Sequence, residues 1–187
     1  IFLFPIIFSG RRRHGDIQHW IQSLRQTTDN YDIIPLAIDT ANDHSNNLLD
    51  ATLIDTLVQL TIDGFVISAQ LAPPCETWSQ ARGKPITQPD GTTTTGPKIL
   101  RNNNHLFALP LLNYKDWKQA NNANLLLLTS LQLATAVSHA GGLAMLEHPA
   151  QPRDDTASIW NLPELHATFH NDNLSLIHIS EPTRRIT

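Results

Sequence analysis

The stretch "GFVISAQLAPPCETWS", residues Gly64–Ser79, joins a strand signal to the one cysteine of this chain. Its first part is a mainly apolar run that is typical of a buried strand. Proline fixes φ and removes an N–H donor, so Pro73 and Pro74 end the run and hold the following thiol in one place. A lone cysteine is more often an inert packing residue, but the position of Cys75 at the exit of a strand favours a role in chemistry.

Other apolar runs along the chain indicate further strands, and helix-like segments separate most of them. The expected strands cover residues 3–10, 32–39, 64–72 and 143–149. Apolar residues at helical spacing predict helices over 16–26, 48–61 and 115–142, and the last of these is stopped by Gly141 and Gly142. A short helix over 157–169 is expected to break at Pro163. This alternation predicts an α/β fold with a doubly wound, mostly parallel sheet and helices on both faces.

In such a sheet, the residues that follow the strands gather at one edge. Right-handed crossovers place the C-terminal ends of parallel strands on the same side, and ligands bind there. Four points of the chain come at the ends of expected strands: Gly10, Asp39, Pro73–Cys75 and Glu147. We therefore expect these residues to meet at a common site.

The first of these points lies in "FSGRRRHGD", residues 8–16. Gly10 between a strand and a helix start leaves backbone N–H groups and room for a cofactor. The segment lacks a complete G-x-G-x-x-G pattern, so an ordinary strand-to-helix turn is the alternative. Arg11, Arg12 and Arg13 are suited to phosphate groups, or they form a solvated charged loop.

Two more of these points, Asp39 and Glu147, each carry a carboxylate. An acid after the second strand typically accepts hydrogen bonds from a ribose diol, although Asp39 comes 29 residues after Gly10 and also suits a turn or helix cap. Glu147 leaves a buried strand, where a carboxylate is costly unless it is paired or lies in a cleft. It is either a partner of a nearby Arg or Lys, or a proton donor or hydrogen-bond acceptor for a substrate.

The polar stretch from about Ser79 to Asn104 contains Gly, Pro and the run "TTTT". It is too long for an ordinary connection between two elements of a compact domain. We interpret it as a functional loop or a flexible insert. Arg82 lies within it and is a cation available to the Cys75 segment.

Composition restricts the classes of function. The 187 residues suffice for one domain, 41% of them are hydrophobic, and the formal net charge is −4, which argues against an overall basic coat for nucleic acid. One cysteine excludes an internal disulfide and a zinc site of several cysteines, and it fits an intracellular location in the cytoplasm or nucleus. No metal site is expected. The run "IFLFPIIF" is too short to span a bilayer, so no membrane association is expected either.

Both ends of the chain are unusual. It begins with Ile1 inside an apolar run, and we interpret it as a fragment. At the other end, "LSLIHISEPTRR" has the character of a translated adapter sequence. We therefore assign residues 1–174 to one domain and residues 175–187 to a non-native tail.

Three segments, taken together and in this order, resemble the DNA cytosine-C5 methyltransferases. "FSG" at Phe8–Gly10 is similar to the Phe-x-Gly signature that ends the first strand of that family. "PPCETWS" at Pro73–Ser79 is similar to the family's nucleophile motif, in which Pro-Cys is followed by an aromatic residue and Ser. Glu147 occupies the place of the Glu in the family's Glu-Asn-Val motif, although "EHP" stands here. The resemblance covers roughly Phe4 to Ala150.

The resemblance implies an S-adenosylmethionine-dependent methyltransferase of the doubly wound type, acting on DNA or RNA. Cys75 would attack C6 of a cytosine and Glu147 would bond or protonate N3, so that C5 takes the methyl group. The target base would leave the helix stack, and the 79–104 loop would close on the DNA. S-adenosylmethionine would be bound by Phe8, Ser9, Gly10, Asp39 and Pro73, and nucleic acid by Arg11, Arg12, Arg13, Ser79 and Arg82.

Two other classes of function remain open. The chain has no Gln-x-Arg-x-Arg motif and no recognition domain, so a catalytically inactive relative from a mobile element that binds nucleic acid or a partner is one alternative. A cysteine hydrolase that pairs Cys75 with His14 or His148 is the other. A cysteine hydrolase would require an oxyanion hole, and this hypothesis leaves the position of Glu147 unexplained.

Overall fold

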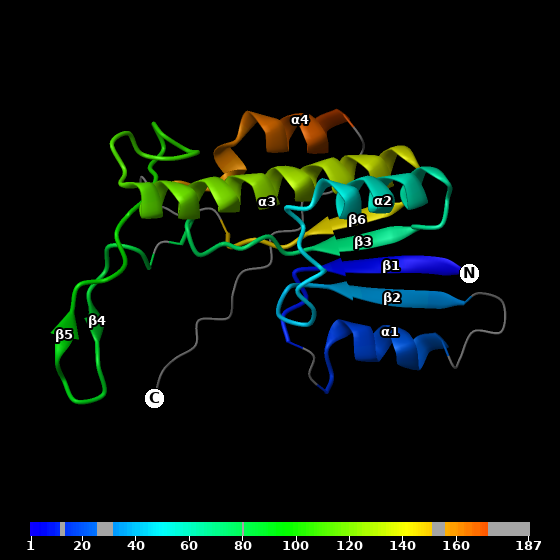
Figure 1. Cartoon of the computed structure of the whole chain (residues 1–187), viewed down its shortest axis with the longest axis horizontal. Helices are drawn as coiled ribbons and strands as arrows, with labels where there is room; N and C mark the ends of the chain where they lie inside the picture. Colours follow the sequence, from blue (N-terminus) through cyan, green and yellow to red (C-terminus); the bar gives the residue numbers. More distant parts are fainter. Residues whose placement is uncertain (12–13, 26–31, 80, 151–155, 172–187) are drawn as a thin grey trace.

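The computed structural model describes residues 1–11, 14–25, 32–79, 81–150 and 156–171. Its centre is a sheet of four parallel strands in the order β2-β1-β3-β6. These strands are β1 (Phe2–Ile7), β2 (Ile33–Ile38), β3 (Ser68–Leu71) and β6 (Leu143–Leu146). All four arrowheads point the same way in Figure 1, toward the side from which the loop after β3 departs. The predicted parallel α/β sheet is therefore confirmed.

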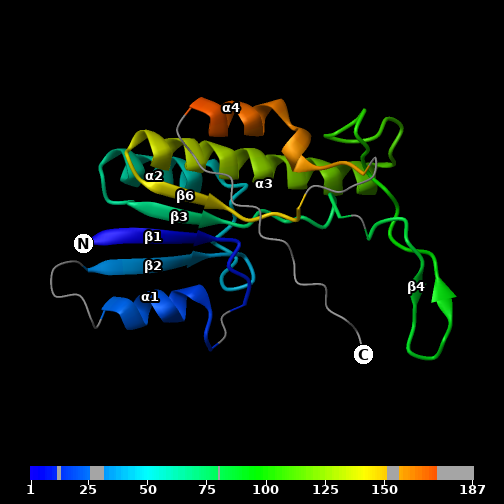
Figure 2. The same cartoon turned by 180° about the vertical axis from the view of Figure 1, so that it is seen from behind.

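The helices lie on the two sides of this sheet. They are α1 (Ile17–Arg25), α2 (Ala51–Ile62), α3 (Tyr114–His139) and α4 (Pro163–Asn171), with a short 3₁₀ turn, η1 (Ile159–Asn161), before α4. From β1 the chain steps across the sheet to β2, and from β2 it steps back past β1 to β3 in the opposite direction. Right-handed crossovers therefore place α1 on one face of the sheet and α2 and α3 on the other. Both views agree with this placement, and α4 packs on the outer side of α3 (Figures 1 and 2).

The main core fills the space between the sheet and the pair α2 and α3. Alternate strand residues such as Ile7, Ala69 and Leu71 face this core and are almost completely buried. Residues of α2 and α3, among them Leu57 and Leu133, pack on them from above. Burial of this apolar face supplies the main driving force for folding.

The opposite face is covered unevenly. Ile6 points to this side and is buried, because α1 lies over the β1–β2 half of the sheet. Leu143 on β6 points the same way and is 59% exposed, and Met145 beside it is also exposed. Within the described residues, the prediction of helices on both faces thus holds only for the half of the sheet under α1. The reason is that, of the described helices that connect the strands, only α1 lies on that face.

Two segments are more structured than their sequence signals indicate. The 79–104 stretch, predicted as a functional loop or a flexible insert, contains a hairpin of β4 (Ile86–Thr87) and β5 (Thr93–Thr94) and then returns to bury Leu100. This hairpin projects away from the sheet in both views (Figures 1 and 2). The helical segment expected over 157–169 is interrupted directly before Pro163, between η1 and α4, and Pro163 begins α4 because the first helical position requires no N–H donor.

The ends of the helices follow their sequence signals. Asp50 caps α2 by accepting a hydrogen bond from the Thr52 N–H, and Asn113 caps α3 by accepting one from the Asp116 N–H. After α3 the chain turns at Gly141, whose φ of 79° a glycine adopts without strain. None of the helices in the described ranges combines the length and apolar character needed to cross a membrane.

Candidate functional site

The C-terminal ends of the four parallel strands form a continuous edge. The hydrogen-bond ladder continues one residue past the strands: the Phe8 N–H donates to Ile38 O at 2.9 Å, and the Ala72 N–H donates to Ile7 O at 3.2 Å. The Glu147 N–H likewise donates to Leu71 O at 2.8 Å. The segments that carry the predicted site residues therefore leave the sheet side by side, as the strand pattern predicts.

The loop after β1 is held by residues that follow β2. The carboxylate of Asp39 accepts hydrogen bonds from the Gly10 N–H at 2.9 Å and from the Ala41 N–H at 2.7 Å. The side-chain amide of Asn42 donates to Ser9 Oγ and to Gly10 O. Asp39 and Asn42 thus fix the shape of the β1 loop. Sequence reasoning missed Asn42, because its partner lies 32 residues away.

This loop adopts an uncommon backbone conformation. Phe8 has a φ of 61° and Gly10 a φ of 68°, both in the left-handed region. That conformation is strained for Phe8, since non-glycine residues rarely adopt it outside turns and functional sites. A Cβ added at Gly10 would meet no atom within 4 Å, so open space adjoins its backbone.

The β1 loop also lies at the point where the strand order reverses. The connection from β1 leads to β2 on one side, and β3 is the neighbour of β1 on the other side. In open parallel sheets, ligands bind in the crevice at the C-terminal ends of the strands beside such a reversal. Phe8 and Gly10 follow β1 and Pro73 follows its neighbour β3, so the two segments leave the sheet side by side at this reversal.

The Cys75 segment is a short, anchored turn. The Trp78 N–H donates to Cys75 O at 2.9 Å and closes this turn. Trp78 is only 5% exposed and lies in a second core with residues of α3 and α4, while Pro73 and Thr77 are also buried. Cys75 itself is half-buried. Its backbone is therefore fixed on both sides by buried neighbours, while part of the residue stays open to solvent.

Glu147 leaves β6 beside the Cys75 segment, because β3 and β6 are neighbours in register from Ser68 to Leu71. Its side chain is exposed and accepts a hydrogen bond from Gln70 Nε2 at 3.3 Å. This neutral partner leaves the carboxylate able to accept further hydrogen bonds. The sequence predicts either an Arg or Lys partner for Glu147 or a role toward a substrate. Among the described residues, the side chain that bonds to the Glu147 carboxylate is Gln70.

His148 follows Glu147 and turns into the second core. Its ring lies between the Trp78 and Trp160 rings, with both centroid distances 6.5 Å and near-perpendicular planes. Burial, and to a lesser extent the charge of Arg101, lower the pKa of His148 from 6.5 to about 4. The ring is therefore neutral at pH 7 and a weak base. This argues against a cysteine hydrolase that pairs Cys75 with His148.

The low pKa of His148 predicts a loss of stability in acid. Between about pH 6.5 and pH 4 the unfolded chain binds a proton at this ring that the folded chain does not bind. The contribution of His148 to stability is thus complete above pH 6.5 and falls by roughly 3 kcal/mol as the pH decreases through this window. Urea denaturation between pH 7 and pH 4 measures the effect. A His148→Phe variant should show a shallower decrease, and equal slopes for both proteins would contradict the prediction.

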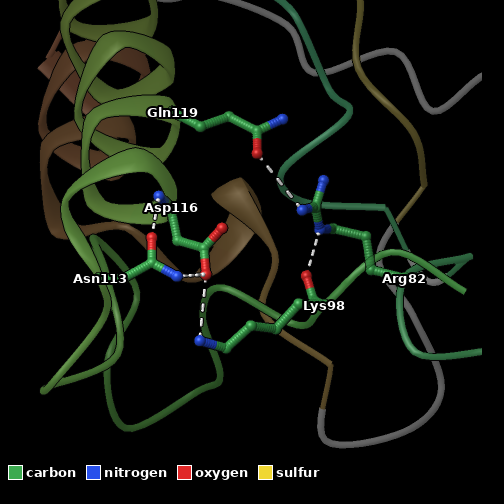
Figure 3. Close-up of polar contacts among 5 residues, drawn as sticks. All are labelled: Arg82, Lys98, Asn113, Asp116 and Gln119. Atoms are coloured by element: carbon green, nitrogen blue, oxygen red, sulfur yellow. Dashed lines mark hydrogen bonds and ion pairs between the residues drawn. The ribbon is translucent and has the colours of Figure 1, made fainter.

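Arg82 and Lys98 join the loop after Cys75 to the start of α3 (Figure 3). Arg82 Nε donates to Lys98 O at 2.7 Å, and Arg82 Nη2 contacts Gln119 Oε1 at 3.4 Å. Lys98 Nζ pairs with Asp116 Oδ2 at 3.0 Å, and the Asn113 side-chain amide donates to the same oxygen. A shallow groove runs beside these contacts, lined by Glu76, Ser79, Ala81, Arg82, Pro97, Lys115 and Gln119. The predicted residues Ser79 and Arg82 therefore share one surface.

Arg101 is the main residue that sequence reasoning missed. It lies in the stretch expected to be a loop, yet it is 3% exposed and its guanidinium stacks on the Trp78 ring at 3.8 Å from the centroid. No local pattern marks it, because its partners come from other parts of the chain. Leu100 beside it is the one local sign that the segment is buried.

The predicted arginine run is seen only in part. Arg11 is exposed, and Arg12 and Arg13 lie outside the described residues. The assigned tail of residues 175–187 also lies outside them. In the described part of the chain, no group of three His, Cys, Asp or Glu side chains is placed to hold a metal ion.

Comparison of the chain with protein-family models, curated proteins and solved structures gives no match.

Proposed function

We propose that this chain transfers a methyl group from S-adenosylmethionine to C5 of cytosine in DNA, with Cys75 as the nucleophile. The observation that carries the proposal is the pairing of β3 with β6, which brings the Cys75 segment and Glu147 out of the sheet as neighbours. The strand reversal between β1 and β3, where such sheets bind ligands, lies next to the Cys75 segment. A nucleophile, an acid and a place for the cofactor at one edge are what this reaction requires.

The residues around the strand reversal have features that fit the cofactor. Phe8, Ser9 and Gly10 follow β1 and Pro73 follows β3, and the space beside the Gly10 backbone is open. Each oxygen of Asp39 accepts one backbone hydrogen bond, and each retains capacity for a second from a ribose hydroxyl. S-adenosylmethionine bound here would supply an electrophilic methyl group.

The chain's own residues activate the base. The thiolate of Cys75 forms a bond to C6 of cytosine, and the C5–C6 double bond opens toward C5. Glu147 bonds to N3 or protonates it and so stabilises the negative charge that develops on the ring. Once C5 carries the methyl group, loss of the C5 proton and departure of the thiolate restore the double bond.

The surface beside the site has the character of a nucleic-acid interface. Tyr114 and Trp117 at the start of α3 are 74% and 47% exposed, and their rings stack with centroids 6.3 Å apart. Lys115 and Arg82 line the adjacent groove. Exposed aromatic faces next to cations suit stacked bases and backbone phosphates of a strand whose target base has left the helix.

One observation favours a second candidate, an inactive relative that binds nucleic acid or a partner. One carboxylate oxygen of Asp39 accepts a hydrogen bond from the Gly10 N–H and the other accepts one from the Ala41 N–H. Holding the loop is therefore enough to explain why an Asp stands at this position. A chain that has lost the cofactor would still need Asp39 for this purpose. The two candidates therefore differ in cofactor binding, not in fold.

A trapping experiment tests the proposal. DNA containing 5-fluorocytosine is incubated with the protein and S-adenosylmethionine labelled in the methyl group. The fluorine at C5 cannot leave as a proton does, so the enzyme is expected to remain joined to the DNA in a labelled, denaturation-resistant complex. DNA with ordinary cytosine is the control and should be methylated without trapping. Absence of both cofactor binding and the complex would overturn the proposal.

A further inference from the structure

The segments that carry Cys75 and Glu147 are joined by a ring contact beyond the end of the sheet. Backbone pairing of β3 with β6 ends where the Glu147 N–H donates to Leu71 O at 2.8 Å. Further along the two segments, the Trp78 and His148 rings lie edge to face, with centroids 6.5 Å apart and planes at 82°. Aromatic pairs with this geometry attract each other. Side-chain packing therefore continues the connection that the backbone ladder begins.

The ring of His148 is enclosed on its other side by Trp160. These two rings also have centroids 6.5 Å apart, with planes at 84°. Trp160 is 7% exposed, and its Nε1–H donates to Pro149 O at 2.7 Å. Both ring nitrogens of His148 are shielded from solvent. The two residues that follow Glu147 are thus both anchored to the same buried tryptophan.

The Trp78 ring is anchored independently of His148. It belongs to the second core, together with apolar side chains of α3 and α4. The Arg101 guanidinium lies over its face, 3.8 Å from the ring centroid. The Trp78 N–H donates to Cys75 O, so the ring and the thiol belong to one closed turn. Because packed interiors deform little, Trp78 offers His148 a rigid surface that belongs to the Cys75 segment.

We propose that His148 is a positioning residue for methyl transfer: its ring, held between the two tryptophans, fixes Glu147 relative to Cys75. The hydrogen bond from Gln70 Nε2 to the Glu147 carboxylate is long, at 3.3 Å, so the position of this acid depends on what anchors the residue after it. The inference rests on the proposed function, in which the thiol and the acid must reach C6 and N3 of one base. A displacement of about 1 Å at such a site can cost about 10²-fold in rate.

Reaction of the Cys75 thiol with iodoacetamide tests the structural part of the proposal without any substrate. The chain has one cysteine, so the mass gained by the whole folded protein reports on Cys75 alone. His148→Ala empties the place between the two tryptophans. We expect its thiol to react at least about threefold faster, because the turn opens more often. His148→Phe keeps a flat ring in that place and should react at the original rate.

Two further variants separate positioning from a general loss of stability. Val58→Ala removes contacts from α2 to the main core, so it should lower the free energy of unfolding and leave the thiol rate unchanged. His148→Leu supplies apolar volume but no flat ring, and it should react faster than the original chain. It takes the place of His148→Ala if that protein does not fold. All rates are compared at a temperature at which circular dichroism shows every variant folded.

Single-turnover methyl transfer tests the catalytic part of the proposal. We expect His148→Ala to slow the chemical step by at least about tenfold, because the acid and the nucleophile no longer meet the base together. The Kd for S-adenosylmethionine should stay the same, and His148→Phe should restore the rate of the chemical step. This division between binding and chemistry is not expected from a loss of stability alone.

The thiol rates decide the outcome. A faster reaction in His148→Ala that returns to the original rate in His148→Phe supports the proposal. An unchanged rate in the folded His148→Ala and His148→Leu proteins would overturn it, and so would an equal increase in Val58→Ala or an unchanged chemical step in His148→Ala. If the original chain transfers no methyl group, the methyl-transfer proposal fails, and the thiol rates still show whether His148 fixes the Cys75 turn.

Discussion

Replacing Cys75 by Ser is expected to abolish the trapped complex with 5-fluorocytosine DNA and to reduce methyl transfer by more than about 10⁴-fold. A serine hydroxyl is far less nucleophilic than a thiolate near neutral pH, so it does not add to C6 at a useful rate. The reduction should appear in single-turnover kinetics as a loss of the chemical step, with cofactor affinity unchanged. This result would assign the covalent role to Cys75 rather than to a neighbouring side chain.

The substitution is mild for the fold. Serine is close to cysteine in size, Cys75 is half-buried, and the turn at this point is closed by backbone atoms of Cys75 and Trp78. Thermal unfolding should therefore be nearly the same for both proteins. Thr95→Ala serves as the matched control, since it removes an exposed hydroxyl from the 79–104 stretch without touching the thiol. A Cys75→Ser protein that still forms the complex would contradict the prediction.

Replacing Arg101 by Ala is expected to lower the free energy of unfolding by roughly 3 kcal/mol. The change removes the guanidinium from the Trp78 ring and leaves four acceptors without their donor. Three of them are buried, namely Thr77 Oγ1, Ala120 O and Asn124 Oδ1, and Leu106 O is partly buried. Relief of the buried charge offsets part of this loss. The effect is large because these acceptors belong to three separate segments that Arg101 holds together.

Urea denaturation followed by circular dichroism measures this effect. Arg11→Ala is the control, because Arg11 is exposed and exposed substitutions usually change stability by less than about 0.5 kcal/mol. Arg101→Met adds a further comparison, since its side chain keeps apolar packing on Trp78 but restores no donor. A denaturation midpoint for Arg101→Ala equal to that of the Arg11→Ala control would show that Arg101 does not stabilise this region.

The two predictions are connected by the chain itself. Thr77 and Trp78, which contact Arg101, come directly after the Cys75 position in the same turn. Loosening of this contact should make the thiol less well positioned. Under the proposed function, we therefore expect Arg101 to act as a positioning residue for Cys75.

The order of strands and helices was predictable from the sequence because each element carries its own signal. Apolar runs such as residues 32–39 and 64–72 contain the strands β2 and β3, and Asp50 and Gly141 mark helix ends through local hydrogen bonds and φ values. Handedness and short connections then place the strand ends together. The common edge that carries the segments of Gly10, Asp39, Cys75 and Glu147 follows from these local rules.

The roles of individual side chains at that edge were less predictable. For Asp39 the sequence leaves open a ribose acceptor or a turn cap. The structure shows the cap, with hydrogen bonds from the Ala41 and Gly10 N–H groups, and these leave each oxygen able to accept a further bond. Pro163 marks the expected interruption between η1 and α4 and is also the first residue of α4, because proline disrupts the interior of a helix but suits its first turn. Whether a proline begins or interrupts a helix depends on its position in that helix, and the residue type alone does not reveal this position.

The sequence by itself determined the parallel α/β sheet and the placement of the Cys75 segment and Glu147 at its edge, since periodicity and turn chemistry are local properties of the chain. Only the tertiary structure decided that Arg101 is buried on Trp78 beside Arg82, and that the 79–104 stretch returns to bury Leu100. The donors and acceptors of Arg101 are up to 24 residues apart in the chain, so they meet only after the helices and loops have packed. Burial of a charge depends on all the surfaces around it, and no local pattern contains that information.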